Sequence, residues 1–412
     1  MKKSLFGYGL TTKAIAKSGG WDIFDDKFEG VKFDEFGNIL RHSSEFDPNL
    51  SYLEIPSPGI PPFNEIIKKS RNLISEYDYF LGSKDEFNKS FGSINKIPPK
   101  SVWISGTNGK TTTSKMTQHL LENYGSELGG NVGTPLAELN LNAKLWILET
   151  SSFTIHYTKF AKPDIYALLP ITNDHLSWHG SFNEYQKAKL KPLLMMKEGS
   201  IAIIPEIYAT TPSLAKIISY KDEADLANKF GLNLNQICFK TPFLMDAVLA
   251  MSIAKIVSNS QNYELMNSFV IEANKLEEIF DKHSRLWVND TKATNIDACI
   301  QALNRYKSQK IHLILGGDAK GVDLELIFGV LDKLSVEIYT IGEAQDEILN
   351  LSTKYNLIAH KCDELSTAVN LISKSLKKDE VALLSPACAS LDQFKSYAHR
   401  GEVFKQSIDK LD

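Results

Sequence analysis

The stretch ISGTNGKTTT, residues 104–113, places two glycines, a lysine and three threonines after an apolar run. Gly106 and Gly109 allow the backbone N–H groups of a turn to point toward an anion. A helix beginning after the turn adds partial positive charge, Lys110 can neutralise nucleotide phosphates, and the Thr111 hydroxyl can bind magnesium. The spacing is shorter than in the common G-x-x-x-x-G-K-S/T loop. The stretch still predicts a strand, a phosphate-binding turn and a helix.

Other short apolar runs end in Gly, Asp, Glu, Asn or Pro, and several lead into helical patterns. Such runs, bounded by turn signals, are typical of buried parallel strands. They span 101–105, 145–149, 164–172, 285–290, 311–318, 336–343 and 381–386. The helix expected over 111–125 has one apolar face. That face consists of Met116, Leu120, Leu121 and Tyr124. The alternation of strands and helices predicts an α/β fold.

Composition changes at two places along the 412 residues. Residues 84–100 are polar and contain Pro-Pro before a strand, whereas residues 258–284 have a helical, charged pattern before a strand that begins at Leu286. We therefore expect three domains, each built on a mostly parallel sheet. They are a Rossmann-like domain over 1–95, a P-loop ATPase domain over 96–272 and a second Rossmann-like domain over 273–412.

The composition argues against several classes of protein. A formal net charge of −4 gives little electrostatic attraction to nucleic acid. The four cysteines are far apart and form no C-x-x-C pair, which favours free thiols in a reducing cytosol over a structural zinc site. No apolar run reaches the roughly 18 residues of a transmembrane helix, and the first residues lack the apolar region of a signal peptide.

Polar side chains follow two more strands of the central region. Glu149 ends one strand, and Asp174, His175 and His179 follow another. Carboxyl ends of parallel strands face the ligand crevice in open α/β sheets, so Glu149 could bind magnesium on a nucleotide. A solvated strand end and buried structural histidines are the alternatives. Lys189 lies on an expected helix, where an ordinary lysine is solvated and, being protonated, cannot ligate a metal ion.

The compact G-T-N-G-K-T loop resembles that of the Mur ligase superfamily, which includes folylpolyglutamate synthases and forms amide bonds with ATP. Three stretches resemble its D-glutamate-adding members: VNDTKATNIDA (288–298), ILGGDAKGVDL (314–324) and LLSPACASLDQFKSYAHRGEVF (383–404). The resemblance spans nearly the whole chain. It implies a cytoplasmic, monomeric enzyme of peptidoglycan precursor synthesis. Its substrates would be ATP, UDP-N-acetylmuramoyl-L-alanine and D-glutamate, and it would act through an acyl phosphate.

The resemblance implies a nucleotide and metal site. ATP would contact Gly106, Thr107, Asn108, Gly109, Lys110, Thr111, Thr112, Lys275 and Asp290. Two Mg2+ ions would be held by Thr111, Glu149, His175 and Lys189. The A-K-L triplet at 188–190 matches the family segment whose lysine is carbamylated by CO2, which would make Lys189 an anion. The implied catalytic residues are Lys110, Glu149, His175 and Lys189.

The resemblance also implies two substrate sites. The UDP-substrate would contact Gly9, Leu10, Thr11, Asp25, Asp26, Lys27, Asn131, Ser151 and Ser152. The loop PSPGIPP (56–62) resembles an S-P-G-I loop of the same domain. D-Glutamate would contact Lys292, Thr294, Lys320, Ser390, Leu391 and Tyr397.

The sequence departs from the family pattern in detail. The stretch PFLMDAVLA (242–250) lacks the His-Asn motif found near adenine, and Ser177 replaces a common acidic residue. The family has an arginine at the position of Lys275. A lysine there supplies positive charge but lacks the bidentate fork of an arginine. Three alternatives stay open: an L-alanine-adding Mur ligase, a folylpolyglutamate-synthase-like enzyme, and a regulatory P-loop protein that ligates nothing. The set of Glu149, His175 and Lys189 disfavours the last.

Overall fold

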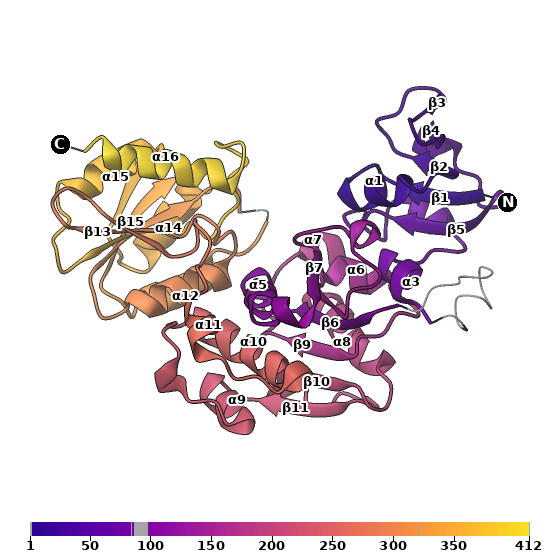
Figure 1. Cartoon of the computed structure of the whole chain (residues 1–412). Helices are drawn as coiled ribbons and strands as arrows, with labels where there is room; N and C mark the ends of the chain where they lie inside the picture. The colour runs from indigo at the N-terminus through magenta and orange to yellow at the C-terminus, as the bar shows by residue number, and fades with distance from the viewer. Residues whose placement is uncertain (1, 84, 86–97, 320, 412) are drawn as a thin grey trace. The chain divides into compact units, whose positions relative to one another are not determined.

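The computed structural model describes residues 2–83, 85, 98–319 and 321–411. These form two compact units, Met1–Phe269 and Val270–Asp412. Within the described residues the first unit carries two sheets and the second carries one (Figure 1). The pairing is mostly parallel, which confirms the expected α/β fold on three mostly parallel sheets. The boundary expected near residue 95 falls outside the described residues, so the three-domain division stays a prediction.

The first sheet has the strand order β3-β4-β2-β1-β5. The strands are β1 Lys2–Phe6, β2 Trp21–Phe24, β3 Lys32–Phe33, β4 Ile39–Arg41 and β5 Ser51–Pro56. The helices are α1 Leu10–Ala16, α2 Glu65–Lys69 and α3 Glu76–Leu81. Leu5 pairs with Ile23 on one side and with Ile55 on the other, and all three are fully buried. Only β3 runs antiparallel to its neighbour among the described strands of this sheet.

The second sheet is parallel throughout its described strands, in the order β11-β10-β9-β6-β8-β7. The strands are β6 Lys100–Ser105, β7 Ser126–Gly130, β8 Leu145–Glu149, β9 Ile165–Leu168, β10 Ile201–Pro205 and β11 Lys216–Tyr220. The helices are α5 Lys110–Leu121, α6 Ser152–Tyr157, α7 Leu176–His179, α8 Phe182–Met195, α9 Glu223–Phe230, α10 Phe243–Ser258 and α11 Tyr263–Asn267. Because β6 lies between β8 and β9, the carboxyl ends of these strands meet at one edge.

Helix α5 buries Met116 and Leu121 of its expected apolar face, and it buries several hydroxyl groups as well. Tyr124 is 37% exposed and lies beyond the helix, in a 3-10 turn, so its expected place on the buried face was wrong. The Thr113 hydroxyl donates to Asp246 Oδ1 of α10 at 2.8 Å, and the Thr117 hydroxyl donates to the Thr113 carbonyl at 2.7 Å. Short side chains that bond to the helix backbone or to one neighbour can be buried without loss of hydrogen bonds.

The third sheet, in the second unit, has the order β12-β13-β17-β14-β15-β16. The strands are β12 Glu277–Phe280, β13 Leu286–Asn289, β14 Ile311–Gly316, β15 Val336–Ile341, β16 Ala359–Asp363 and β17 Val381–Leu384. The helices are α12 Ile296–Tyr306, α13 Glu325–Leu331, α14 Gln345–Lys354, α15 Leu365–Ser373 and α16 Tyr397–Asp409. Within this unit, α15 and α16 cover one face of the sheet and α12 the other (Figure 1).

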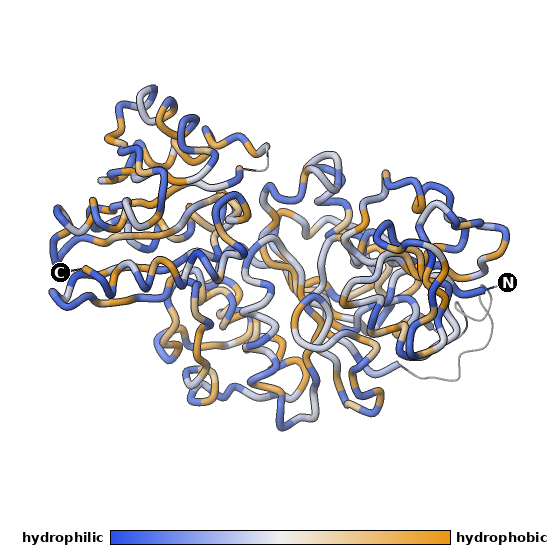
Figure 2. Tube along the Cα trace, turned by 90° about the horizontal axis from the view of Figure 1, so that it is seen from above, coloured by the Kyte–Doolittle hydropathy of each residue, from blue (hydrophilic) through white to orange (hydrophobic). Residues whose placement is uncertain are grey.

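Strand β12 corrects the helical pattern expected over residues 258–284. Residues Glu277–Phe280 pair antiparallel with β13, and Ile279 packs against the core of the third sheet. The side chains of β12 alternate between half-buried and exposed, which suits the edge strand of a sheet, where one face remains in water. Figure 2 shows the same principle in each unit: apolar residues gather along the buried strands, while the turns are hydrophilic.

A buried carboxylate joins α3 to the segment that follows α6. Asp78 is fully buried. Its oxygens accept hydrogen bonds from the backbone N–H groups of Lys159, Phe160 and Ala161 at 2.6–3.0 Å. These bonds fix the first sheet against the second inside the first unit. Among the described residues, no helix has the length and apolarity required to cross a bilayer.

Candidate active site

The turn after β6 requires glycine at two positions. Gly106 has a φ of 137° and Gly109 a φ of 84°, both in the region that favours glycine. A Cβ on Gly106 would lie 2.5 Å from Leu169 Cβ, and one on Gly109 would lie 2.4 Å from Asp246 Oδ1. Gly109 is also the N-cap of α5, so the N–H groups of the first helical turn lie at this loop.

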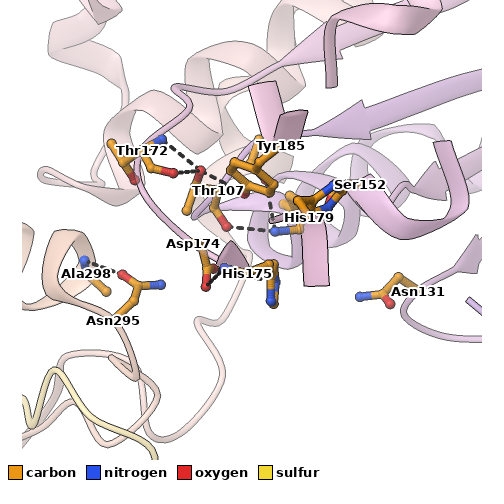
Figure 3. A network of polar contacts seen from close by, with 12 residues as sticks. Thr107, Asn131, Ser152, Thr172, Asp174, His175, His179, Tyr185, Asn295 and Ala298 are labelled. Atoms are coloured by element: carbon orange, nitrogen blue, oxygen red, sulfur yellow. Dashed lines mark hydrogen bonds and ion pairs between the residues drawn. The ribbon is translucent and has the colours of Figure 1, made fainter. Parts of the chain in front are cut away.

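Thr107 is held in place by its neighbours rather than by solvent. Its hydroxyl donates to the Thr172 carbonyl at 3.1 Å and lies 3.0 Å from the Tyr185 hydroxyl (Figure 3). The Thr172 N–H in turn donates to Thr107 Oγ1 at 2.9 Å, and the Thr107 N–H donates to the Pro170 carbonyl at 3.0 Å. The loop is therefore fixed to the segment after β9.

Two lysines converge on one carbonyl of the loop. Lys110 Nζ donates to Gly106 O at 3.0 Å and to Thr107 O at 2.7 Å. Lys189 Nζ donates to the same Gly106 O at 2.7 Å, although it comes from α8. Lys189 is only 1% exposed, which contradicts the reading of a solvated lysine. Burial, helped by the charge of Lys110, holds the pKa of Lys189 well below its usual value.

Glu149 has one carboxylate oxygen engaged and one without a partner. It is 2% exposed and pairs in register with Ile104, two residues before the loop. Oε1 accepts from Asn131 Nδ2 at 2.6 Å. Oε2 is buried and has no hydrogen-bond partner among the residues that the structure describes. A buried, unpartnered carboxylate oxygen is costly, so this position suits a cation.

The two histidines of the D-H-L-S-W-H segment differ in environment. His175 has a φ of 53°, its side chain is 45% exposed, and Nε2 lies 3.6 Å from Asp174 Oδ2 (Figure 3). His179 is buried, and its Nε2 lies 2.9 Å from Ser152 Oγ. Burial, together with the charge of His156, lowers the pKa of His179 to about 4. His179 is thus a neutral structural histidine, whereas His175 remains accessible.

Among the described residues, no three His, Cys, Asp or Glu side chains form a group that could hold a metal ion. The predicted magnesium ligands contain only two residues of these types, Glu149 and His175. Thr111 lies in the first turn of α5, and Lys189 would need modification to become a ligand. The unpaired Oε2 of Glu149 is the observation that fits a cation here.

The residues predicted for the UDP-substrate follow β1 and β2, which pair in parallel. Asp25 joins the two turns, because Oδ2 accepts from the Tyr8 N–H at 2.7 Å and Oδ1 from the Lys27 N–H at 2.9 Å. Asp26 accepts from the Ser43 hydroxyl. At the start of α1, Gly9 is the N-cap and Leu10 is 85% exposed. The structure thus brings together Gly9, Leu10, Thr11, Asp25, Asp26 and Lys27.

The other three residues predicted for this substrate lie at the carboxyl end of the second sheet. Asn131 follows β7 and bonds Glu149 through both its side chain and its N–H. Ser151 is the N-cap of α6, where its hydroxyl accepts from the Thr154 N–H at 3.1 Å. Ser152 bonds His179. Each therefore has a structural role of its own.

In the second unit, Asp290 is buried after β13. Its Oδ2 accepts from the Ser385 hydroxyl at 2.8 Å and its Oδ1 from the Leu276 N–H at 3.2 Å. Burial raises the pKa of Asp290 to about 7. Lys275, predicted beside it for ATP, pairs with Glu272 at 2.8 Å.

Apart from Lys320, the residues predicted for D-glutamate follow β13 and β17, which are neighbours. Lys292 Nζ lies 4.1 Å from the centre of the Tyr397 ring, a cation–π contact. Ser390 is buried, whereas the adjacent Leu391 is 70% exposed. Thr294 is bonded through its N–H to the Lys292 carbonyl at 2.9 Å. Lys320 lies outside the described residues.

Sequence reasoning missed Arg400 of α16. It is fully buried, and its guanidinium donates to the carbonyls of Thr291, Cys388 and Ala389 at 3.1–3.2 Å. It therefore ties the loop after β13 to the loop after β17, the two loops that carry the predicted D-glutamate residues. The neighbouring Gly401, a glycine inside a helix, was the available signal of close packing.

Comparisons with known proteins agree with this arrangement. A model of the Mur ligase middle domain matches residues 104–241. The chain aligns with UDP-N-acetylmuramate–alanine ligase MurC from Thermotoga maritima at 15% identity and a TM-score of 0.55, covering 98% of each chain. It aligns with MurF from Acinetobacter baumannii at 17% identity and a TM-score of 0.56, covering 75% of this chain and 76% of that one. At such identities the likeness shows the fold alone, which is that of the Mur ligases.

Relatives in sequence are much closer. The chain is 58% identical, over 100% of both chains, to a protein of Campylobacter jejuni strain RM1221 named UDP-N-acetylmuramoylalanine–D-glutamate ligase. It is 42% identical, again over 100% of both, to a protein of the same name from Helicobacter pylori strain 26695. The chain belongs to the UDP-N-acetylmuramoylalanine–D-glutamate ligase family of Mur ligases.

Proposed function

We propose that this protein uses ATP to join D-glutamate to UDP-N-acetylmuramoyl-L-alanine, a step of peptidoglycan precursor synthesis in the cytoplasm. The observation that carries the proposal is the convergence of Lys110 and Lys189 on the Gly106 carbonyl, next to the strand that ends in Glu149. Such a set would place the positive charge of Lys110 on one side of a phosphate and the metal-binding oxygen of Glu149 on the other. The names of the full-length relatives support the choice of substrates.

In the first step, the alanine carboxylate attacks the γ-phosphorus of ATP, the bond to ADP breaks, and an acyl phosphate forms. Two anions must approach each other for this to happen. Lys110 and the N–H groups at the start of α5 offset their repulsion and the negative charge of the transition state. The loop is rigid, because Thr107 and both glycines are fixed by close contacts, so its dipoles need little rearrangement.

We propose that two Mg2+ ions bind beside the loop, with Thr111, Glu149, His175 and Lys189 as ligands; the unpartnered Oε2 of Glu149 supports a cation there. Bound magnesium would neutralise phosphate charge and orient the γ-phosphoryl group. Lys189 could take part only as an anion, which carbamylation by CO2 would supply. Its burial supports this reaction, because a lysine whose pKa is strongly lowered has the uncharged amine that adds to CO2.

In the second step, the amine of D-glutamate attacks the acyl carbonyl, and phosphate leaves as the tetrahedral intermediate collapses. We assign its binding to the loops after β13 and β17, which Arg400 holds together. The residues in question are Lys292, Thr294, Lys320, Ser390, Leu391 and Tyr397. Lys292 supplies positive charge for a carboxylate, and exclusion of water protects the acyl phosphate from hydrolysis.

Phosphate release by the purified protein tests this function. Release should require ATP, UDP-N-acetylmuramoyl-L-alanine and D-glutamate together, with L-glutamate and both alanine enantiomers inactive. Turnover of L-alanine with UDP-N-acetylmuramate would favour an alanine-adding ligase. Turnover of glutamate on a folate would favour a folylpolyglutamate-synthase-like enzyme. Release that depends on neither substrate would favour a regulatory nucleotide-binding protein.

A further inference from the structure

Two helices of the second sheet, α6 and α7, donate hydrogen bonds to a loop that belongs to the first sheet. This loop, residues 57–60 (Ser-Pro-Gly-Ile), follows β5 and is here called the SPGI loop. The Tyr157 hydroxyl of α6 donates to the Ile60 carbonyl at 2.6 Å. The Trp178 indole N–H of α7 donates to the Gly59 carbonyl at 3.2 Å. Both bonds lie inside the first unit, and both reach successive carbonyls of one short loop.

The SPGI loop also borders the turn predicted to bind the UDP-substrate. The Ser57 N–H donates to the Phe6 carbonyl at 2.7 Å, at the end of β1. A Cβ placed on Gly7 would lie 3.2 Å from Ser57 Cβ, and one on Gly9 would lie 3.4 Å from Ser57 Oγ. A ligand held at the turn after β1 therefore meets the SPGI loop directly.

On its other side, helix α7 adjoins the candidate metal ligand His175. Helix α7 has four residues and lies between His175, with a φ of 53°, and Gly180, with a φ of 82°. The Trp178 N–H donates to the His175 carbonyl at 3.1 Å, so the two residues belong to one helical turn. The Trp178 ring is 4.6 Å from the Phe153 ring, and Phe153 is 4.7 Å from His175, measured between ring centres.

We propose that Trp178 and Tyr157 are positioning residues that couple the UDP-substrate site to the nucleotide site. Binding of the UDP-substrate fixes the SPGI loop, the loop fixes α7 through the indole N–H, and α7 and Phe153 set the position of His175. This inference rests on the proposed function. Because coupling between two binding sites is reciprocal, bound nucleotide must strengthen binding of the UDP-substrate by the same factor.

A purely structural role would be to attach the first sheet to the second. That role already belongs to Asp78, which bonds three N–H groups beyond α6. Tyr157 and Trp178 differ because they bond loop carbonyls next to a predicted ligand, and because their helices carry Ser152 and flank His175. If Tyr157 and Trp178 only attach the two sheets, their variants should be less stable. If they couple the two sites, their variants should change the ratio of the UDP-substrate affinities measured with and without nucleotide.

The test removes single donors and measures that ratio. Trp178→Phe deletes the indole N–H, and Tyr157→Phe deletes one hydroxyl. Matched controls are Trp146→Phe, which deletes an indole bond to the Asn140 carbonyl, and Tyr220→Phe, which deletes a hydroxyl bond to the Leu168 carbonyl. Calorimetry gives the Kd of UDP-N-acetylmuramoyl-L-alanine with and without a non-hydrolysable ATP analogue and Mg2+. Thermal melting checks folding.

In the wild type and both controls, the analogue should tighten binding about fivefold or more. In Trp178→Phe and Tyr157→Phe, the ratio should fall to within about twofold of one, with each ligand's separate affinity nearly unchanged. A ratio that survives in both variants, is lost equally in the controls, or is absent from the wild type overturns the inference. Failure of the wild type to bind the UDP-substrate at all would instead reject the proposed function. Tyr157→Phe changes one atom and carries the test if Trp178→Phe does not fold.

Discussion

At the scale of single residues, burial decides what the side chains around the phosphate loop can do. An ammonium group in water keeps its proton, but Lys189 is surrounded by protein and lies near a second cation. The same loss of water leaves Glu149 Oε2 without a partner. A buried carboxylate oxygen without a partner is destabilising, so the environment of Glu149 supports the cation proposed there.

Replacing Lys189 by alanine should lower kcat by about 100-fold or more, because an anionic ligand opposite the phosphates is lost. Acetate or propionate should restore part of the activity by entering the space as a carboxylate. Growth with 13C-labelled bicarbonate should give a carbamate NMR signal that disappears in the variant. The control is Lys187→Ala, two residues earlier, whose side chain is 62% exposed. Full activity of Lys189→Ala would refute the ligand role.

Asp290 should make stability depend on pH. Its pKa is about 7 in the folded protein against 3.8 for an ordinary aspartate, so the unfolded chain loses the proton first as pH rises. Stability contributed by the protonated form is therefore lost between about pH 4 and pH 7. Asp290→Asn should remove this slope and raise the unfolding free energy near pH 8 by roughly 4 kcal/mol. Urea unfolding at several pH values measures it, and an unchanged slope would contradict the assignment.

At the scale of elements, the phosphate loop works because backbone, not side chain, faces the ligand. The carboxyl ends of β6, β8 and β9 bring together the loop, Glu149 and the His175 turn. Close packing of α5 on α10 brings Asp246 against Gly109. The N-terminal partial charge of α5 is thereby directed at one point. The geometry of the candidate site is thus set by the carboxyl ends of three strands and by the first turn of one helix.

Gly109→Ala should abolish nucleotide binding, because its Cβ would clash with Asp246 Oδ1. A matched control separates this clash from backbone strain. Gly199 has a φ of 82°, close to the 84° of Gly109, but a Cβ there meets nothing within 4 Å. Gly199→Ala should cost only about 1 kcal/mol of stability and leave nucleotide affinity intact. Equal effects of the two substitutions on nucleotide affinity would show that the packing against Asp246 is unimportant.

At the scale of the whole molecule, the chain is two compact units joined near residue 270. Each unit has its own buried core, including Trp103 and Trp146 in the first and Trp287 in the second. Units with separate cores can unfold separately, so a single two-state transition is not expected. The predicted nucleotide loop belongs to the first unit, and the predicted D-glutamate loops belong to the second.

We therefore expect two unfolding transitions in urea. Trp287 is the one tryptophan of residues 270–412, so a variant with the other four replaced by phenylalanine reports on the second unit alone. ADP at about 100 times its Kd should stabilise the first unit by about 2.7 kcal/mol. Coincident transitions by Trp287 fluorescence and by circular dichroism would show that the units unfold together.

Much of the fold could be predicted, because local patterns carry it. Apolar runs ending in turn residues marked the strands on either side of the phosphate loop, and G-T-N-G-K-T marked the turn itself. Strand β12 was missed because its four residues, Glu-Glu-Ile-Phe, show no charged–apolar alternation, and so short a run cannot be told from a helical segment. The buried threonines of α5 were missed because short polar side chains carry no apolar signal. Arg400 was missed because its only local signal, the helical Gly401 beside it, indicates close packing without showing that the arginine itself is buried.

The sequence by itself determined the α/β fold, the phosphate-binding turn and, through motif resemblance, the family. These depend on local conformation: a glycine turn, a strand end and a helix start are written in consecutive residues. Only the tertiary structure decided that Lys189 is buried against Gly106, that Glu149 keeps one oxygen unpaired, and that His175 and His179 have opposite environments. Burial and pKa depend on residues distant in the chain, and only folding brings those residues together.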